Sequence, residues 1–297
     1  MMGDFLYFYE HIPYHINPVF FSAGFFRVSW YAMMYIVAFG VVYLLLRYRI
    51  RRKEIFNFQF SLGNQFPISN DQILKLLTDF LLYSFLGLLI GARLGYVFFY
   101  NFSFFWHNPL AIISPFDLMT GKFIGIYGMS YHGGLIGVII VAVIFCRKNS
   151  ISFWRWANFV VPAIPLGYFF GRLGNFLSGQ LYGRVTTKPW GMYFPGVNQL
   201  RHPSQLYEAA LEGLILFAVL WPLRNKKIMR ENTLATYIIG YAVARMICEF
   251  FREPDPQIGI LAGYFTMGQL LSFLMLLGGL IIFLRTKKSA MMVYKEK

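Results

Sequence analysis

The chain has 297 residues, of which 57% are apolar, 20% aromatic and only 13% charged. Soluble globular chains carry roughly 25% charged residues, so this composition excludes an ordinary water-soluble domain and is typical of a membrane protein. The net charge of +14 favours nucleic-acid binding at first sight, but the charge is distributed between loops in a way that argues against that partner.

Seven apolar runs approach the ~20 residues that a helix needs to cross a bilayer. They are 28–46, 77–99, 130–146, 157–176, 208–223, 234–251 and 263–284. No connecting segment is long enough for a separate globular domain. We therefore predict an all-α, polytopic integral membrane protein with about seven transmembrane helices, in which residues 1–297 form a single membrane domain. The first run is expected to act as the insertion signal, because residues 1–27 lack the pattern of a cleavable signal peptide.

The basic residues concentrate in alternate loops. The loops after the first, third, fifth and seventh runs contain Arg47, Arg49, Arg51, Arg52, Lys53, Arg147, Lys148, Arg155, Arg224, Lys226, Lys227, Arg230, Arg285, Lys287, Lys288, Lys295 and Lys297. The other loops contain only Arg27, Lys122, Arg184, Lys188, Arg201 and Arg252. The positive-inside rule then places the N-terminus outside and the C-terminus in the cytoplasm. Since topology explains the charge, we predict no nucleic-acid partner.

Three connecting segments have distinct character. The segment 55–76 ends in Ser69 and Gln72 at the spacing of a capping box, which predicts a helix start. The external segment 101–129 is apolar but broken by prolines, which indicates a re-entrant or interfacial piece and not a span. The external loop 177–207 is the longest polar one, and loops of this size are often functional.

Three arginines lie inside or at the edge of apolar runs: Arg93, Arg172 and Arg245. A charge at membrane depth costs at least ~2.5–3.5 kcal/mol on insertion scales, and such charges usually face a partner, a substrate or an aqueous pathway. We interpret these three as part of a binding site for an anion.

The fourth run ends in a segment rich in polar residues and glycine, 171–183. Arg172 offers a fork of donors that fits phosphate oxygens. Asn175 lies three residues further on, and hence on the same helical face. The glycines leave room for a headgroup. The alternative is that Arg172 only extends to the outer interface along its apolar stem.

Two further patterns carry polar groups at the membrane. His132 is followed by two glycines at the start of the third run, which indicates either a close approach of backbone or lipid, or simple helix packing. Tyr241, Arg245 and Glu249 are four residues apart and share one helical face. Arg245 and Glu249 can form a structural ion pair at this spacing, which is the alternative to a ligand site.

The predicted topology places these polar residues in the outer half of the membrane, on five different spans. They are Tyr31, Arg93, His132, Arg172, Asn175, Arg245 and Glu249. The natural anion at this depth is a phospholipid headgroup, so we predict a site that faces the outer leaflet.

These residues, in this order, resemble the prolipoprotein diacylglyceryl transferase family of bacterial inner-membrane enzymes. The family signature Gly-Arg-x-Gly-Asn-Phe-x-Asn-x-Glu-x-x-Gly is followed closely by 171–183. The resemblance extends to 30–31, 91–95, 131–134, 201–208, 241–249 and 250–255, and so covers almost the whole chain. Ser178 and Gln180 depart from it, because they replace an Asn and a Glu of the signature. If the Glu of the signature acts as a base, this chain lacks that base; if it is an orienting group, Gln180 can replace it. We favour the second interpretation, because a neutral amide keeps an acceptor in a similar volume.

The resemblance implies transfer of the diacylglyceryl group from phosphatidylglycerol to the lipobox cysteine thiol of prolipoprotein signal peptides. It also implies the bacterial inner membrane as the location. In this interpretation His132, Arg245, Glu249 and Tyr31 are catalytic, whereas Arg172, Asn175, Gly183, Arg93 and Tyr241 bind substrate. His132 accepts the thiol proton, the arginines stabilise the departing phosphate, and Glu249 orients Arg245 or, as an alternative, serves as the base.

No metal or other cofactor is implied, because no cluster of His, Cys or carboxylate residues has metal-site spacing. Cys146 and Cys248 both lie in spans, which argues against a disulfide. Two other functional classes stay open at this point. A secondary transporter also places charges in spans, although it would favour inverted repeats and a site at the midplane. A non-catalytic phospholipid-binding protein needs the arginines but neither His132 nor the stripe from Tyr241 to Glu249.

Overall fold

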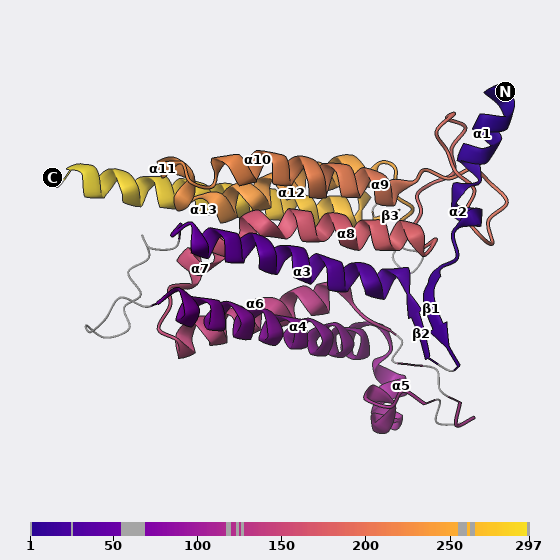
Figure 1. Cartoon of the computed structure of the whole chain (residues 1–297), viewed down its shortest axis with the longest axis horizontal. Coiled ribbons are helices and arrows are strands. Elements are labelled where there is room, and N and C mark those ends of the chain that lie inside the picture. Colours follow the sequence, from indigo (N-terminus) through magenta and orange to yellow (C-terminus); the bar gives the residue numbers. More distant parts are fainter. Residues whose placement is uncertain are drawn as a thin grey trace. The chain divides into compact units, whose positions relative to one another are not determined.

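The computed structural model describes residues 2–24, 26–54, 69–116, 120–122, 125, 128–254, 260–261 and 265–295. Most of these residues are helical (Figure 1). The strands form two short antiparallel pairs, β1 (Val19–Ala23) with β2 (Phe26–Ser29) and β3 (Ile260–Leu261) with β4 (Phe265–Thr266). The all-α class is therefore confirmed. The chain forms two compact units, here called the first unit (Met1–Arg49 and Ala157–Lys297) and the second unit (Ile50–Trp156).

The first unit begins with two short helices, α1 (Met2–Glu10) and α2 (Ile12–His15), and the β1–β2 hairpin. The hairpin leads into α3 (Trp30–Arg51), and the Trp30 N–H donates to the Pro18 carbonyl at 3.1 Å. α1 and α2 contact the loop after α8, since Tyr9, Ile12 and Ile16 pack against its buried Met192 and Phe194.

The predicted fourth span is a broken helix. It consists of α7 (Phe153–Val160), the 3-10 turn η2 (Val161–Ala163) and α8 (Ile164–Leu177). Pro162 and Pro165 account for the break, because proline lacks an N–H and its ring clashes with the preceding turn.

The predicted fifth span is continuous but changes geometry along its length. α9 (Ser204–Glu208) passes into a π-helical segment, η3 (Ala209–Ile215), and then into α10 (Leu216–Leu223). The short α11 (Lys227–Arg230) precedes α12 (Thr233–Glu249), which packs along α13 (Met267–Lys295). α8 packs along η3, so that α8, α9, α10, α12 and α13 run side by side (Figure 1).

The second unit is built on α4 (Asn70–Tyr100) and α6 (Tyr131–Lys148), which pack against each other through glycines. A Cβ atom at Gly91 would lie 2.4 Å from the Gly133 carbonyl oxygen, and one at Gly137 would lie 2.1 Å from the Gly87 oxygen. Only residues without a side chain allow the two backbones to approach this closely. The helix-packing interpretation of the glycine after His132 is thus confirmed for Gly133.

The remaining predictions for the second unit are partly confirmed. The Ser69–Gln72 capping box is present, and it starts α4 at Asn70, seven residues before the predicted span. The rest of that prediction, 55–68, lies outside the described residues. The described part of 101–129 contains two short helices, α5 (Phe102–His107) and η1 (Pro109–Ile112), and no span. Its placement at the membrane stays a prediction.

Within the described part of the chain, five helical stretches are long and apolar enough to cross a membrane. They are Trp30–Arg51, Asn70–Tyr100, Tyr131–Lys148, Ser204–Leu223 and Met267–Thr286. The other two predicted spans correspond to α8 and α12, which have 14 and 17 residues. The total of seven stays a prediction, as does the single membrane domain.

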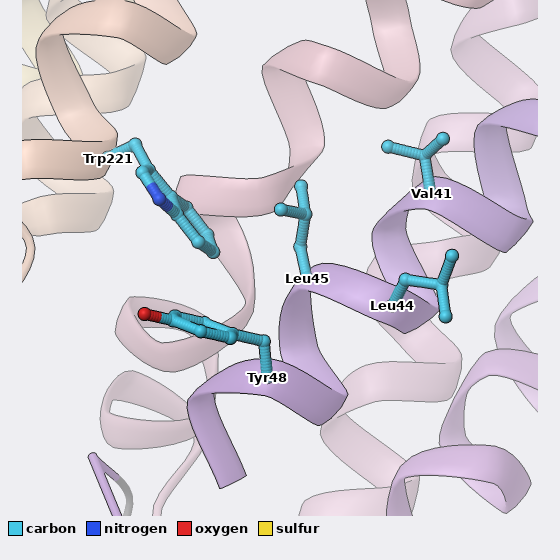
Figure 2. Close-up of a pocket in the computed structure, with 5 residues that line it drawn as sticks. All are labelled: Val41, Leu44, Leu45, Tyr48 and Trp221. Atoms are coloured by element: carbon cyan, nitrogen blue, oxygen red, sulfur yellow. The ribbon is translucent and has the colours of Figure 1, made fainter. Parts of the chain in front are cut away.

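An open apolar groove of about 440 Å³ lies between α3 and α10 (Figure 2). It is lined by Val41, Leu44, Leu45, Tyr48 and Trp221. Tyr48 lies seventeen residues after Tyr31 in the same helix, which corresponds to roughly 25 Å along the axis. This groove is therefore at the opposite end of α3 from the predicted site.

Candidate active site

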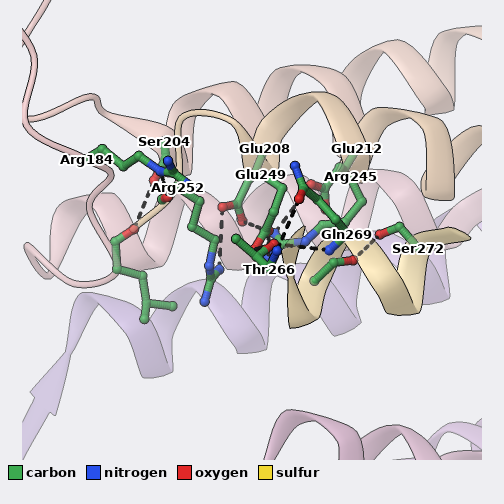
Figure 3. A network of polar contacts seen from close by, with 12 residues as sticks. Arg184, Ser204, Glu208, Glu212, Arg245, Glu249, Arg252, Thr266, Gln269 and Ser272 are labelled. Atoms are coloured by element: carbon green, nitrogen blue, oxygen red, sulfur yellow. Dashed lines mark hydrogen bonds and ion pairs between the residues drawn. The ribbon is translucent and has the colours of Figure 1, made fainter. Parts of the chain in front are cut away.

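The first unit contains a cluster of six charged residues from α8, α9, η3, α12 and the chain just after α12, here called the polar cluster; Figure 3 labels all of them except Arg172. Its members are Arg172 from α8, Glu208 from α9, Glu212 from η3, Arg245 and Glu249 from α12, and Arg252 just after α12. All six side chains are 15% exposed or less. Three positive and three negative groups are thus brought together inside a predominantly apolar bundle.

Glu208 is the centre of the polar cluster. Its Oε2 lies 2.8 Å from Arg172 Nε and 3.3 Å from Arg245 Nη1, and its Oε1 lies 3.5 Å from Arg252 Nη1. One fully buried carboxylate therefore holds three guanidinium groups. Because like charges repel strongly in a medium of low dielectric constant, the arginines need this shared counter-ion to remain close.

Arg245 contacts two further carboxylates. Its Nη2 lies 2.7 Å from Glu249 Oε2, and its Nη1 lies 3.6 Å from Glu212 Oε1. The pairing of Arg245 with Glu249 was expected from their spacing in the sequence and is confirmed. Three carboxylates hold the position of Arg245, so its guanidinium is fixed before any ligand arrives.

Arg172 is held by residues one turn before it and one turn after it in α8. Its Nε donates to the Tyr168 hydroxyl at 2.7 Å, and its guanidinium carbon lies 4.9 Å from the centre of the Tyr168 ring. The Tyr168 hydroxyl donates in turn to Glu212. On the other side, Arg172 Nη1 donates to Asn175 Oδ1 at 3.4 Å. The prediction that Arg172 and Asn175 share a helical face is confirmed.

The local backbone explains how Glu212 reaches Tyr168. A Cβ atom at Gly213 would lie 2.8 Å from Phe169 Cβ, so the glycine lets η3 approach α8 closely. The π-helical geometry begins directly after Glu208 and contains Glu212. Single π-helical turns occur frequently at functional sites, and here the turn aligns both carboxylates with the arginines.

Burial of the polar cluster carries a cost in free energy. Removing an ion from water costs several kcal/mol even after relaxation, and its partners must offset this cost through good geometry. Breaking a buried pair by removing one partner typically costs about 3–5 kcal/mol, because an uncompensated charge remains. A functional role best explains the polar cluster, because apolar side chains would fill the same space more stably.

Tyr31 lies at the same end of the first unit as the end of α8. Its backbone N–H donates to Ser178 Oγ at 3.2 Å, and its hydroxyl donates to the Tyr35 hydroxyl at 3.0 Å. Gly174 permits this approach, because a Cβ atom there would lie 2.9 Å from Met34 Cβ and 3.2 Å from Tyr31 Cα. Ser178, which departs from the family signature, thus binds the backbone of a predicted catalytic residue.

Tyr241 and Gly183 have packing contacts. The Tyr241 ring lies edge-on to the Tyr168 ring, with centroids 5.7 Å apart, so it supports the residue that holds Arg172. A Cβ atom at Gly183 would lie 2.2 Å from the Phe251 carbonyl oxygen. The glycine therefore lets the loop 177–207 pair with the chain after α12, where Gly183 and Arg252 form an antiparallel bridge.

Gln180, the second departure from the signature, is held in place by hydrogen bonds of its main chain. Its N–H donates to the Asn175 carbonyl at 2.9 Å, and its own carbonyl accepts from Gln205 Nε2 at 2.6 Å. Its side chain is exposed. The turn around Gln180 thus depends on main-chain contacts that either Glu or Gln satisfies.

Arg93 and His132 belong to the second unit, and their contacts are described within that unit. Arg93 donates to three backbone carbonyls, those of Ala111 at 2.7 Å, Ile112 at 2.8 Å and Gly128 at 3.2 Å. Its guanidinium carbon lies 4.9 Å from the centre of the Phe105 ring. These contacts attach the segment after α4 to that helix. The His132 side chain is exposed and its ring lies 5.7 Å from the ring of Tyr131.

Four residues of this site were not predicted from the sequence. Glu208, Glu212, Tyr168 and Arg252 were given no role, although Glu208 and Arg252 stand in the segments that resemble the family. The signal for the two glutamates was present, because carboxylates inside an apolar run are as costly as arginines. A search for intramembrane charges of both signs finds all three counter-ions. Asp255, the last residue of that resemblance, lies outside the described residues.

Comparisons with known proteins identify the family of the chain. The family model described as prolipoprotein diacylglyceryl transferase matches residues 18–285. Relatives named phosphatidylglycerol–prolipoprotein diacylglyceryl transferase include one from Chlorobaculum tepidum, which is 44% identical over 97% of this chain and 96% of its own length. Another, from Bordetella avium, is 44% identical over 92% and 95%, and one from Campylobacter jejuni is 38% identical over 94% and 97%. The chain belongs to the prolipoprotein diacylglyceryl transferase family.

Proposed function

We propose that this protein transfers the diacylglyceryl group of phosphatidylglycerol to the lipobox cysteine of prolipoprotein signal peptides. In this reaction the cysteine sulfur forms a bond to a glycerol carbon of the lipid. The bond from that carbon to the phosphate oxygen breaks, and glycerol phosphate leaves with the electron pair. The thiol proton passes to a base. Full-length similarity to relatives with this name supports the proposal, and the observation that carries it is the fixed pair Arg172 and Arg245 on one buried carboxylate.

The polar cluster suits the binding of a phosphodiester that becomes a phosphate monoester. Guanidinium groups match phosphate oxygens with two parallel donors. Negative charge grows on the phosphate as it departs, and donors that are already oriented stabilise this charge without reorganising. Arg172 and Arg245 are oriented by Tyr168, Glu208 and Glu249. They are therefore our proposed phosphate ligands, with Asn175 and Tyr31 positioning the headgroup beside them.

The role of Glu249 follows from its contacts. It forms an ion pair with Arg245 and accepts a hydrogen bond from the Thr266 hydroxyl at 3.0 Å. A carboxylate with both oxygens engaged is suited to orient Arg245, so we assign it that role and not the removal of the thiol proton. Thiols react as thiolates, and an imidazole near neutral pH is a suitable acceptor. We keep His132 as the proposed base.

We further propose the orientation and location of the site. The basic loops put the N-terminus outside and the C-terminus in the cytoplasm, under the positive-inside rule. Tyr31 and Ser178 then lie toward the outer side, together with the external loop 177–207. We propose that the protein resides in the bacterial inner membrane with its site facing the outer leaflet. Tyr241 and Gly183 support this site through packing. For Arg93, whose described contacts lie in the second unit, substrate contact stays a prediction from the sequence.

The test is a transfer assay with purified protein, phosphatidylglycerol labelled in its acyl chains, and a lipobox peptide. Label is expected on the peptide cysteine. Loss of one preorganised donor typically lowers kcat by about 10²–10³, so Arg172→Ala and Arg245→Ala should each lower the rate by at least that much. His132→Ala tests the base, and its activity should recover with rising pH as more thiol ionises without help.

Two results would count against the proposal. No transfer by well-folded protein would favour a non-catalytic phospholipid-binding protein or a transporter, and a vesicle flux assay separates these two. Full activity in Arg172→Ala and Arg245→Ala would remove the phosphate site. Arg201→Ala is the matched control, since this arginine pairs with the partly exposed Glu253 and not with the polar cluster.

A further inference from the structure

Glu249 lies between two helix ends of opposite electrostatic character. It is the last residue of α12, where unpaired carbonyl groups give the helix a partial negative charge. A carboxylate at this position is repelled by its own helix. The same carboxylate lies against the first turn of α13, where unpaired N–H groups give a partial positive charge. The favourable field for Glu249 therefore comes from α13.

Thr266 connects the start of α13 to this carboxylate directly (Figure 3). Its hydroxyl donates to Glu249 Oε1 at 3.0 Å and accepts from the Gln269 N–H at 3.2 Å. Gln269 Oε1 accepts in return from the Thr266 N–H at 3.1 Å. This reciprocal pattern is a capping box. Because the cap uses the oxygen of the hydroxyl as acceptor, the hydroxyl hydrogen is left to donate to Glu249.

Gly268 provides the space for the same contact. A Cβ atom at this position would lie 2.5 Å from both the carboxyl carbon and Oε1 of Glu249. No side chain fits without displacing the carboxylate. Gly278 lies further along the same helix, and a Cβ atom there would meet nothing within 4 Å. Gly279 is also tight, but against Ile239, so Gly268 is the glycine of α13 at which an added side chain would displace Glu249.

The two carboxylate oxygens of Glu249 have different partners. Oε1 is held by Thr266, and Oε2 lies 2.7 Å from Nη2 of Arg245. We propose that Thr266 and Gly268 are positioning residues for the transfer reaction, which fix the Glu249 carboxylate and through it the Arg245 guanidinium. In this role both residues act through Glu249 and not by direct contact with the lipid. This inference rests on the proposed function, because it depends on Arg245 binding the phosphate.

The experiment uses four variants of the full chain in the transfer assay, with kcat and KM for phosphatidylglycerol measured separately. Thr266→Val removes the hydroxyl and keeps the shape, and it should lower kcat roughly tenfold or more, the usual loss for a hydrogen bond to a charged group. Thr266→Ser restores the hydroxyl and should restore kcat. Gly268→Ala should lower kcat at least as much as Thr266→Val, and Gly278→Ala is the matched control with unchanged kcat. Thermal unfolding in detergent measures how much of each variant is folded.

A double-mutant cycle with Glu249→Gln distinguishes positioning from a simple helix cap. If Thr266 acts through Glu249, Thr266→Val should change kcat less than about twofold in the Glu249→Gln background, because interacting sites are not additive. An equal loss in both backgrounds would overturn the inference, and so would full kcat in Thr266→Val. If Gly268→Ala fails to fold, the Val and Ser variants of Thr266 still decide the question.

Arg245→Ala separates failure of this inference from failure of the proposed function. Unchanged kcat and KM in Arg245→Ala would refute the phosphate site, and the positioning role with it. A large loss in Arg245→Ala together with full activity in Thr266→Val and Gly268→Ala would refute only the positioning role. Parallel losses with recovery in Thr266→Ser support both.

Discussion

Glycines let α4 and α6 pack closely, whereas α8, α9, η3 and α12 are also joined by ion pairs between charged side chains. Both regions contain an arginine at the depth of an apolar helix, but its partners differ. Arg93 donates to neutral backbone carbonyls, while Arg172 and Arg245 pair with carboxylates. Carbonyl dipoles satisfy one arginine and fix the course of the chain. Carboxylates are needed where several arginines lie close together, as in a site where more than one guanidinium group binds a phosphate.

Glu208→Gln should have the largest effect on stability, because it leaves three guanidinium groups without their shared counter-ion. We expect a loss of about 3–5 kcal/mol, measured by thermal or denaturant unfolding in detergent. Glu253→Gln is the matched control: its pair with Arg201 is 46% exposed on the glutamate side, and such pairs contribute only about 0–1 kcal/mol. Similar losses in the two variants would mean that burial does not distinguish these ion pairs.

Gly137→Ala tests the other region and should destabilise by about 1–3 kcal/mol, the usual cost of overpacking. The added Cβ atom would lie 2.1 Å from the Gly87 carbonyl oxygen, so α4 and α6 would have to separate. Gly40→Ala in α3 is the control, since nothing lies within 4 Å of that position. There we expect no loss, because alanine is a better helix former than glycine. Unchanged stability in Gly137→Ala would show that the two helices can move apart at no cost.

Arg93→Lys should cost about 1–2 kcal/mol, because one ammonium group cannot reproduce the fork that reaches three carbonyls. Limited proteolysis after α4 reports the loosened segment, and KM for phosphatidylglycerol reports any role in binding. We expect faster cleavage with an unchanged KM. A raised KM with unchanged cleavage would return Arg93 to the group of substrate ligands predicted from the sequence.

The smallest effect concerns pH. Burial, and secondarily the charge of Lys188, lowers the pKa of His202 below its ordinary value of 6.5. The unfolded chain then binds a proton more readily than the folded chain. The contribution of His202 to the stability of the folded state is therefore complete above pH 6.5, and it is lost as pH falls through the folded-state pKa. The unfolding temperature should therefore decrease between pH 7 and 5 by more in the unmodified protein than in His202→Gln. Equal slopes would contradict this assignment.

Short-range geometry accounts for the parts of the site that the sequence predicted correctly. Pairs three or four residues apart on a helix must share a face, which gave Arg172 with Asn175 and Arg245 with Glu249. The capping box before α4 was visible for the same reason. The break at η2 was missed although two prolines mark it, because the apolar run around them is continuous. The π-helical turn at Glu212 leaves no residue pattern that periodicity detects.

The sequence by itself determined the membrane class, the family and the identity of the three arginines, because apolar length, ordered motifs and misplaced charges are all properties of residues in a row. It did not determine which charges meet. Glu208 joins arginines that lie 36, 37 and 44 residues away, and Glu249 meets Thr266 across a helix boundary. Only the packing of α8, η3, α12 and α13 decided these contacts, since a buried charge takes whichever partner the neighbouring helices bring within reach.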